Sequence, residues 1–154
     1  MLTSDKVNLD IIKEEIKILP DYLDQICLQG TKDNLDPFFG CGLFTTDPNK
    51  KNLTEKDFNV CIFNMPYLNS IIKKHNLYRV RLMKLKPKTC YYYHQDWSKR
   101  FHIPIKTNEK CFLIIDEKVS HLKADGSCYI VDTTKKHTAV NGSKEDRIHI
   151  VGII

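Results

Sequence analysis

Apolar side chains recur with two different periods along this chain, and the change falls near its middle. Over residues 5–19 the apolar positions lie three or four residues apart, which is the spacing of an amphipathic helix. Ser4 or Asp5 can cap the start of this helix, and Pro20 ends it. The apolar positions are Val7, Ile11, Ile12, Ile16 and Leu19. We therefore expect a helix with one buried face.

Two further helices are predicted before the period changes. One is expected over 21–29, where Gly30 can act as the C-terminal cap, and the other over 66–75. Residues 31–52 are rich in Gly, Pro, Asp and Asn, so we predict a loop there. The sequence leaves open whether this loop closes over a site as a lid. The apolar residues of the last helix are Leu68, Ile71 and Ile72.

From Leu77 onward the apolar period becomes two, as expected for strands. Short segments rich in aromatic and β-branched residues alternate with turn signals such as Asp125-Gly126 and Asn141-Gly142. The segments are LYRVRLMKL, TCYYYHQD, RFHIPI, KCFLIID, SCYIVD, HTAV and RIHIVGII. Many short strands favour a sandwich or barrel. The predicted fold is mainly β with N-terminal helices.

The length of 154 residues predicts one domain, with a helical and loop part over 1–76 and a β core over 77–154. The formal net charge of +5 raises the question of nucleic acid as a partner. The excess charge is scattered in lysine pairs, and it forms no basic stripe with interleaved aromatic residues. A nucleic-acid-binding accessory protein is thus a third-ranked hypothesis, and we expect no nucleic-acid partner.

The sequence favours a cytoplasmic protein without a membrane partner. No apolar run is long enough to cross a bilayer, and the first residues are acidic where a secretory signal is basic and then apolar. The six cysteines are widely spread and form no C-x-x-C pair. We interpret them as buried small hydrophobes in a reducing compartment, in preference to a disulfide framework or a zinc site. The oligomeric state is not set by the sequence.

The candidate chemistry begins in the segment YYYHQDWSKRFHIP, residues 91–104, which carries many titratable groups for a strand-like stretch. Residues i and i+2 of a strand share a face, so His94 and Asp96 are expected to point the same way. The same reasoning places Arg100 and His102 together. An H-x-D pair alone is a weak signal, because it is more often a surface hydrogen bond than a ligand set.

Further candidates follow near the end of the chain. His137 opens the segment HTAV, and Arg147 shares a strand face with His149. Two histidines and one carboxylate on one face form the facial triad of non-heme Fe(II) oxygenases, which leaves three coordination positions free. A 2-oxo acid can take two of these and dioxygen the third. A buried arginine suits the far carboxylate of such a co-substrate.

The joint order of these residues resembles the aspartyl/asparaginyl β-hydroxylase-like branch of the 2-oxoglutarate- and Fe(II)-dependent dioxygenases. The resemblance covers residues 77–154, with the motifs H-x-D, R-x-H-[IL]-P, G-x-x-Y-x-[VI]-D and H-x-A-x-N, and an arginine ten positions after the last histidine. It implies a double-stranded β-helix, the cupin-type jelly roll. It also implies a hydroxylase of an amino-acid side chain, either peptidyl Asp, Asn or Pro or a free amino acid, with succinate and CO2 as co-products.

The same resemblance implies the cofactors and their ligands. His94, Asp96 and His137 would bind Fe(II), and Arg147 would pair with the distal carboxylate of 2-oxoglutarate. Some members of this branch lack the carboxylate ligand, whereas this chain has Asp96 and is expected to carry the full triad. Ascorbate is a candidate reductant. No motif of the family falls in the first half of the chain, so the small-molecule or peptide substrate is not identified.

Five other assignments complete the candidate site. The resemblance implies that Arg100 and His102 contact the co-substrate from the metal side. Tyr92 can line the metal face or belong to the core, and Trp97 can line the substrate mouth or cover the core. His149 can support Arg147 or the co-substrate, or be a packed core histidine.

The main alternative to an enzyme is a non-catalytic cupin-like protein that binds a metal or a small ligand. Such a protein would keep the barrel, yet it would not need Arg147 and Arg100 beside the metal. The pair of arginines therefore favours the dioxygenase.

Overall fold

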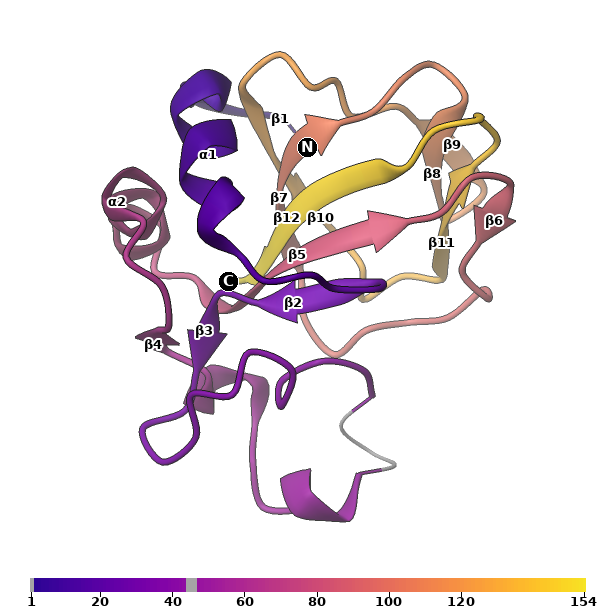
Figure 1. Cartoon of the computed structure of the whole chain (residues 1–154). Helices are drawn as coiled ribbons and strands as arrows, with labels where there is room; N and C mark the ends of the chain where they lie inside the picture. Colours follow the sequence, from indigo (N-terminus) through magenta and orange to yellow (C-terminus); the bar gives the residue numbers. More distant parts are fainter. Residues whose placement is uncertain (1, 44–46) are drawn as a thin grey trace.

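Two antiparallel sheets form the body of the protein in the computed structural model, which describes residues 2–43 and 47–154 (Figure 1). The large sheet has the strand order β1 (Leu2–Lys6), β10 (Ser127–Val131), β7 (Arg100–Lys106), β12 (Arg147–Ile153), β5 (Tyr78–Leu85) and β2 (Gln25–Cys27). The small sheet has the order β6 (Thr89–Cys90), β11 (His137–Asn141), β8 (Cys111–Ile115) and β9 (Lys118–Ser120). A separate pair joins β3 (Gln29–Gly30) to β4 (Val60–Cys61).

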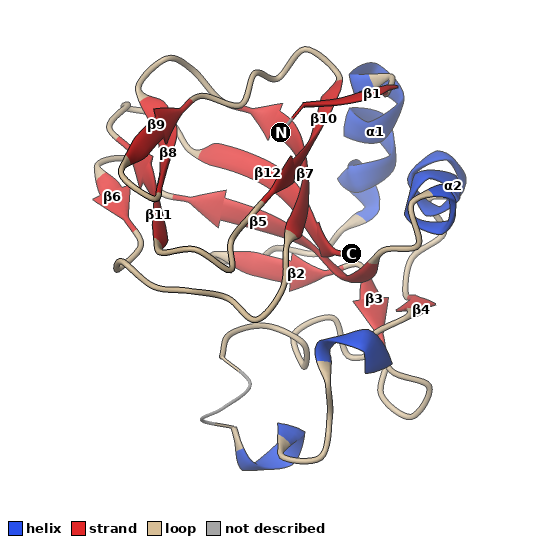
Figure 2. Ribbon diagram, turned by 180° about the vertical axis from the view of Figure 1, so that it is seen from behind, coloured by secondary structure: helices blue, strands red, loops and turns tan. Residues whose placement is uncertain are grey.

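The large sheet lies between the small sheet on one side and two helices, α1 (Leu9–Glu15) and α2 (Pro66–Lys74), on the other (Figure 2). An apolar cluster lies in each of the two spaces. The helix-side core includes Ile12, Leu68, Ile71, Ile72, Val80, Leu82, Phe101, Ile103 and Ile150. The core of the β body includes Leu85, Leu113, Leu122, Tyr129, Val131 and Ala139. This arrangement agrees with the sandwich or barrel predicted from the strand pattern, and it is the jelly roll that the family resemblance implied.

The alternation of side chains along the strands separates the two faces of the large sheet. On β7, Phe101 and Ile103 belong to the helix-side core, and the residues between them, Arg100 and His102, line the cavity between the sheets. Arg147 on β12 lines the same cavity. The polar positions of the period-2 pattern are therefore buried too, because both faces of this sheet are covered.

The first helix was predicted too long. Residues 2–6 form strand β1, which pairs with β10, and the helix begins only after Asn8, whose side chain accepts hydrogen bonds from the backbone N–H groups of Asp10 and Ile11. The cap is thus Asn8, and neither Ser4 nor Asp5. A 3₁₀ turn, Ile16–Ile18, continues the helix up to Pro20.

The helix predicted over 21–29 is wrong, because these residues supply strands β2 and β3. In β2, Ile26 pairs with Leu82 of β5, and Ile26, Cys27 and Leu28 are fully buried. A short apolar run does not distinguish a buried strand from a helix by its period, and here the free edge of β5 decides the outcome. Together with β1, this strand brings the part before residue 77 into the large sheet.

The other predicted elements mostly agree with the structure. Helix α2 and the strands after Leu77 are confirmed, except that TCYYYHQD contributes only the two residues of β6 and an isolated bridge at His94. The loop over 31–52 contains a 3₁₀ turn, Pro48–Lys50, and a further turn, Glu55–Asp57, follows it. Residues 44–46 of the lid candidate lie outside the described residues. Strand β9 was not predicted.

Three of the cysteines are not buried, in contrast to the interpretation of all six as core residues, and of these Cys41 is partly exposed. Cys61 and Cys90 are exposed, whereas Cys27, Cys111 and Cys128 are buried. Within the described ranges, no helix has the length and apolar character to span a membrane.

Candidate metal centre

His94, Asp96 and His137 come together at one end of the small sheet. One ligand atom from each lies within 4.8 Å of the other two. A backbone bridge brings the histidines together, since each main-chain N–H donates to the other's carbonyl oxygen, at 3.0 Å from His94 and 2.8 Å from His137. Asp96 is fixed separately, because its N–H donates to the carbonyl oxygen of Thr133 at 2.8 Å. Backbone pairing therefore places all three side chains.

Both imidazoles present the nitrogen that a metal needs. The Nδ1 atoms of His94 and His137 lie 2.7 and 2.9 Å from the carbonyl oxygens of Tyr92 and Lys135. A carbonyl only accepts, so each Nδ1 carries the proton and each Nε2 has a free lone pair. The Nε2 atoms of His94 and His137 lie 3.7 and 3.9 Å from the carboxylate oxygens of Asp96. These separations are too long for hydrogen bonds, so both Nε2 lone pairs remain available beside the carboxylate, and these three residues would hold a metal.

Burial also favours the neutral form of His137. Desolvation lowers the pKa of His137, and the Lys135 carbonyl and the Asp96 carboxylate offset this only in part. A neutral imidazole is the form that binds metal. The donor set of two imidazoles and one carboxylate therefore fits a divalent first-row metal such as iron.

Consecutive ion pairs from Glu55 through Arg100 hold the carboxylate of Asp96 in position. Nε of Arg100 donates to Oδ2 of Asp96 at 2.8 Å, and the two other guanidinium nitrogens donate to the two oxygens of Glu55 at 3.0 and 3.1 Å. Burial would raise the pKa of Glu55, but Arg100 and Arg79 outweigh it and hold that pKa below its usual range. Glu55 thus stays ionised and orients Arg100.

Arg79 connects the ion pairs of Arg100 and Glu55 to the loop before residue 44. It donates to Glu55 and to the carbonyl oxygens of Gly40 and Gly42, the latter two at 2.9 and 2.6 Å. Its backbone is left-handed, with φ of 44°, at a shift in the register between β5 and β12. Such a bulge redirects a side chain, and here it accompanies the side chain that anchors the loop.

Arg147 is buried on β12, 4% exposed, and donates to Nδ1 of His149 at 3.0 Å. A guanidinium has no acceptor, so Nδ1 of His149 must accept, and Nδ1 of His102, 3.4 Å away, must donate to the same atom. Burial, and then the charge of Arg147, holds the pKa values of both histidines well below the usual range. Burial also lowers the pKa of Arg147 to about 10, so it stays charged at neutral pH.

The six residues to which the resemblance gives roles line one cavity of about 270 Å³. They are His94, Asp96, Arg100, His102, His137 and Arg147. His149 lies behind Arg147 and is 1% exposed. Tyr92 is not a core residue, since it is 65% exposed and stacks beside His94 with ring centroids 4.7 Å apart. Trp97 does not cover the core either, because it is 71% exposed at an adjoining hollow.

Sequence reasoning missed four residues of this site: Gln25, Glu55, Arg79 and Arg81. Arg79 and Arg81 alternate in the predicted strand LYRVRLMKL, so the pattern of two arginines on one strand face was a usable signal. Gln25 lay in the segment that was wrongly predicted as a helix. Glu55 reaches the site from a 3₁₀ turn, and nothing in its local sequence distinguishes it from the surface carboxylates.

The two facing antiparallel sheets and the His-Asp-His cluster inside them define a cupin-type jelly-roll protein with a candidate metal centre. The family model for aspartyl/asparaginyl beta-hydroxylase matches residues 49–152. This match covers more than half of the chain, and the protein therefore belongs to the aspartyl/asparaginyl β-hydroxylase family.

Solved structures show weaker likenesses. A cupin domain from Bordetella pertussis Tohama I is 19% identical with a TM-score of 0.43, over 49% of this chain and 79% of its own. A predicted oxalate decarboxylase from Thermotoga maritima is 20% identical with a TM-score of 0.42, over 53% and 70%. A protein from Photorhabdus luminescens is 18% identical with a TM-score of 0.41. The matched region covers 47% of this chain and 58% of that protein. No curated protein matches.

Proposed function

We propose that this protein is a 2-oxoglutarate- and Fe(II)-dependent dioxygenase. It would hydroxylate an amino-acid side chain, either peptidyl Asp, Asn or Pro or a free amino acid, with succinate and CO2 as co-products. One observation carries the proposal. Two imidazole Nε2 lone pairs and a carboxylate converge in a cavity that also holds the buried Arg147 guanidinium. Membership in the hydroxylase family supports the same reading.

His94, Asp96 and His137 are the residues that would hold iron. The carbonyl oxygens of Tyr92 and Lys135 keep the imidazole tautomers fixed before any metal arrives. Bound Fe(II) supplies the activation of dioxygen, which no amino-acid side chain provides.

Arg100 has a positioning role in this scheme. By donating to Oδ2 of Asp96, it holds the carboxylate so that Oδ1, 3.7 Å from Nε2 of His94, remains for the metal. Its remaining donors are mostly engaged with Glu55 and Ser98. A direct contact of Arg100 or His102 with the co-substrate stays a prediction.

Arg147 would bind the distal carboxylate of 2-oxoglutarate. Its guanidinium has no carboxylate within 4.0 Å among the described residues, so a charge that is buried on folding still lacks its counter-ion. A bidentate carboxylate is the natural partner of such a group. His149 holds the guanidinium in place by accepting one of its N–H groups.

The first test is metal-dependent binding of 2-oxoglutarate, followed by turnover. Purified protein is titrated with 2-oxoglutarate in the presence of redox-stable Mn(II) and, as a control, in EDTA. We expect binding only with the metal, and its loss in His137→Ala. Fe(II), ascorbate and air should then yield succinate. Binding that is indifferent to the metal would contradict the proposal, and binding without any succinate would favour the non-catalytic cupin-like alternative.

A further inference from the structure

The cavity is surrounded by more arginine side chains than carboxylates. Four arginines line it: Arg79, Arg81, Arg100 and Arg147. Asp96 is on its wall, and Glu55 contacts two of the arginines, so the guanidinium groups outnumber these carboxylates by two. A 2+ iron and a 2− co-substrate cancel one another. The excess therefore persists after both are bound, and it calls for a third, anionic component.

Arg81 and Arg147 are the two cavity arginines that contact no carboxylate of the described residues, and the proposed function assigns Arg147 to the distal carboxylate of 2-oxoglutarate. Arg81 is therefore the one that still lacks an anionic partner. Its side chain is buried, 7% exposed, and no carboxylate of the described residues lies within 4.0 Å of it. Its hydrogen-bond partner among the described residues is the neutral amide oxygen of Gln25, which accepts from one terminal nitrogen at 3.0 Å. Its Nε is buried and has no hydrogen-bond partner among the described residues. A donor in this state lacks an acceptor that a ligand can supply.

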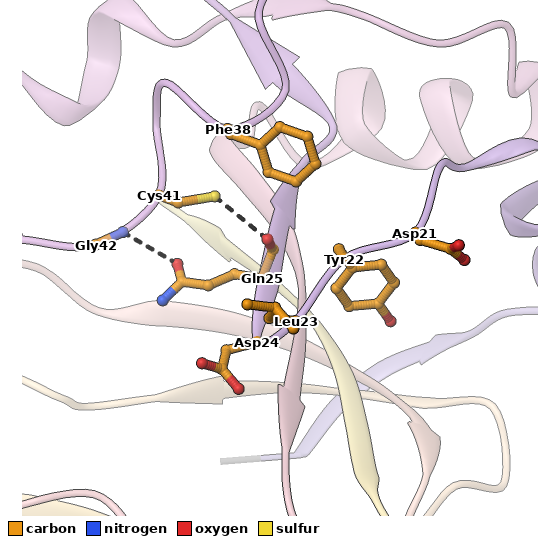
Figure 3. A pocket seen from close by; sticks show the side chains of 8 residues that line it. All are labelled: Asp21, Tyr22, Leu23, Asp24, Gln25, Phe38, Cys41 and Gly42. Atoms are coloured by element: carbon orange, nitrogen blue, oxygen red, sulfur yellow. Dashed lines mark hydrogen bonds between the residues drawn. The ribbon is translucent and has the colours of Figure 1, made fainter.

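Gln25 orients Arg81 but does not neutralise it. The same amide oxygen also accepts from the backbone N–H of Gly42 at 3.4 Å, so the loop before residue 44 helps to fix it (Figure 3). The main chain of Gln25 is tied to that loop by the Cys41 thiol, which donates to its carbonyl oxygen at 3.5 Å (Figure 3). The guanidinium is thereby held in a fixed position, and its charge remains available.

Arg81 and Arg147 lie at separate places on the cavity wall. In the pairing of β5 with β12, Arg81 lies opposite Val151 and Arg147 opposite Leu85. The two are four residues apart along the strands, which corresponds to roughly 13 Å. His149 and Met83, which pair with each other, lie between them. The backbone positions of the two arginines are therefore separate, which leaves room for each guanidinium to meet an anion of its own.

We propose that Arg81, oriented by Gln25, binds a carboxylate of the primary substrate. This inference rests on the proposed function, because it assigns Arg147 to the co-substrate. It makes the substrate a carboxylic acid, whether the carboxylate is the free α-carboxylate of an amino acid or the side chain of an acidic residue. The cavity of about 270 Å³ is shared with 2-oxoglutarate, so the part of the substrate that enters it is small.

The test is binding to protein loaded with Mn(II) and 2-oxoglutarate, measured by calorimetric titration. The acid probes are L-proline, which has an α-carboxylate, and N-acetyl-L-aspartic acid α-amide, which has only a side-chain carboxylate. Their partners without a carboxylate are L-prolinamide and N-acetyl-L-asparagine amide. We expect one acid probe to bind at least tenfold more tightly than its partner, and the identity of that probe tells which source of carboxylate the site takes.

Two variants then locate the contact at Arg81. Arg81→Gln should weaken the acid probe at least tenfold and leave the affinity for 2-oxoglutarate within about threefold. Gln25→Glu places a carboxylate beside the guanidinium in nearly the same volume, so it should block the acid probe in a protein that folds as the parent does. Lys106→Gln is the matched control for a lost positive charge, because its side chain is 49% exposed at the end of β7 and should change neither affinity.

Each contrary outcome has a separate meaning. If Arg81→Gln weakens 2-oxoglutarate instead of the probe, Arg81 serves the co-substrate and the inference is wrong. It is also wrong if the loaded protein binds neither acid probe, or binds the partners without a carboxylate equally well, while metal-dependent binding of 2-oxoglutarate persists. If the unaltered protein shows no metal-dependent binding of 2-oxoglutarate, the proposed function itself is contradicted.

Discussion

The two faces of the large sheet are built from the same strands, but one buries apolar side chains and the other buries charged ones. On the face under α1 and α2, Phe101, Ile103 and Ile150 are almost completely buried among other apolar side chains. On the face toward the small sheet, Arg100 and Arg147 are buried nearly as deeply and line the cavity. Burial of the first set removes apolar area from water, and burial of the second removes charge from water.

The contrast shows how this fold can carry a charged cavity. Burying an arginine without its counter-ion lowers the stability of the protein, and only a ligand can offset that cost. The apolar side chains buried on the helix-covered face keep the sheet folded while no ligand is bound in the cavity. The alternation of strand residues permits both functions in one layer, because neighbouring side chains point to opposite sides.

The largest effect is expected from a cavity on the apolar face. Phe101→Ala removes a ring that is 1% exposed and packs against His75 at a centroid distance of 4.6 Å. We expect the free energy of unfolding to fall by about 3–5 kcal/mol, as measured by urea denaturation. Leu23→Ala, at a side chain that is 77% exposed, is the control and should cost less than about 0.5 kcal/mol. A similar loss in both variants would contradict the division of the faces.

A smaller effect, of opposite sign for stability, is expected on the cavity face. Arg147→Met replaces a buried charge that lacks a counter-ion with an apolar side chain of similar length. We expect the free energy of unfolding to stay the same or rise by about 1 kcal/mol. The affinity for 2-oxoglutarate with Mn(II) should fall about 100-fold. Arg147→Lys keeps the charge without the bidentate fork and should give an intermediate affinity. A large loss of stability in Arg147→Met would show that its charge is already compensated.

The sequence predicted the cavity face better than the N-terminal half. The period of two after Leu77 reflects a local property of strands, so it identified β5, β7 and β12 and the shared faces of Arg100 with His102 and of Arg147 with His149. The wrong helix over 21–29 has a nonlocal cause, because β2 exists only where β5 offers it an edge. The period of the chain contains no information about that edge.

At the site, too, the sequence does not reveal features that depend on distant parts of the chain. His94, Asp96 and His137 were found from their types and order, and the resemblance supplied their roles. Glu55 and Gln25 act on Arg100 and Arg81 across 45 and 56 residues of chain. Their importance comes from buried charges that meet only in the folded protein. No local pattern marks such a residue in advance.

The smallest effect concerns the two buried histidines of the cavity face. Burial and the charge of Arg147 hold the pKa values of His102 and His149 well below the ordinary value of about 6.5. Below pH 6.5 the unfolded chain therefore takes up protons that the folded protein refuses, and the free energy of unfolding falls as the pH falls. From about one pH unit above 6.5 neither state binds these protons, so the contribution is flat there. A proton on His149 would also have to go to Nδ1, which already faces the Arg147 guanidinium.

For the metal-free protein we expect each of these histidines to contribute about 1 kcal/mol of lost stability between pH 6.5 and 5.5, measured by urea denaturation at both pH values. His149→Asn removes one of the two titrations, so the pH-dependent loss should shrink by about that amount. A slope that is unchanged in His149→Asn would mean that this histidine takes up its proton equally in the folded and unfolded states, which would contradict the lowered pKa.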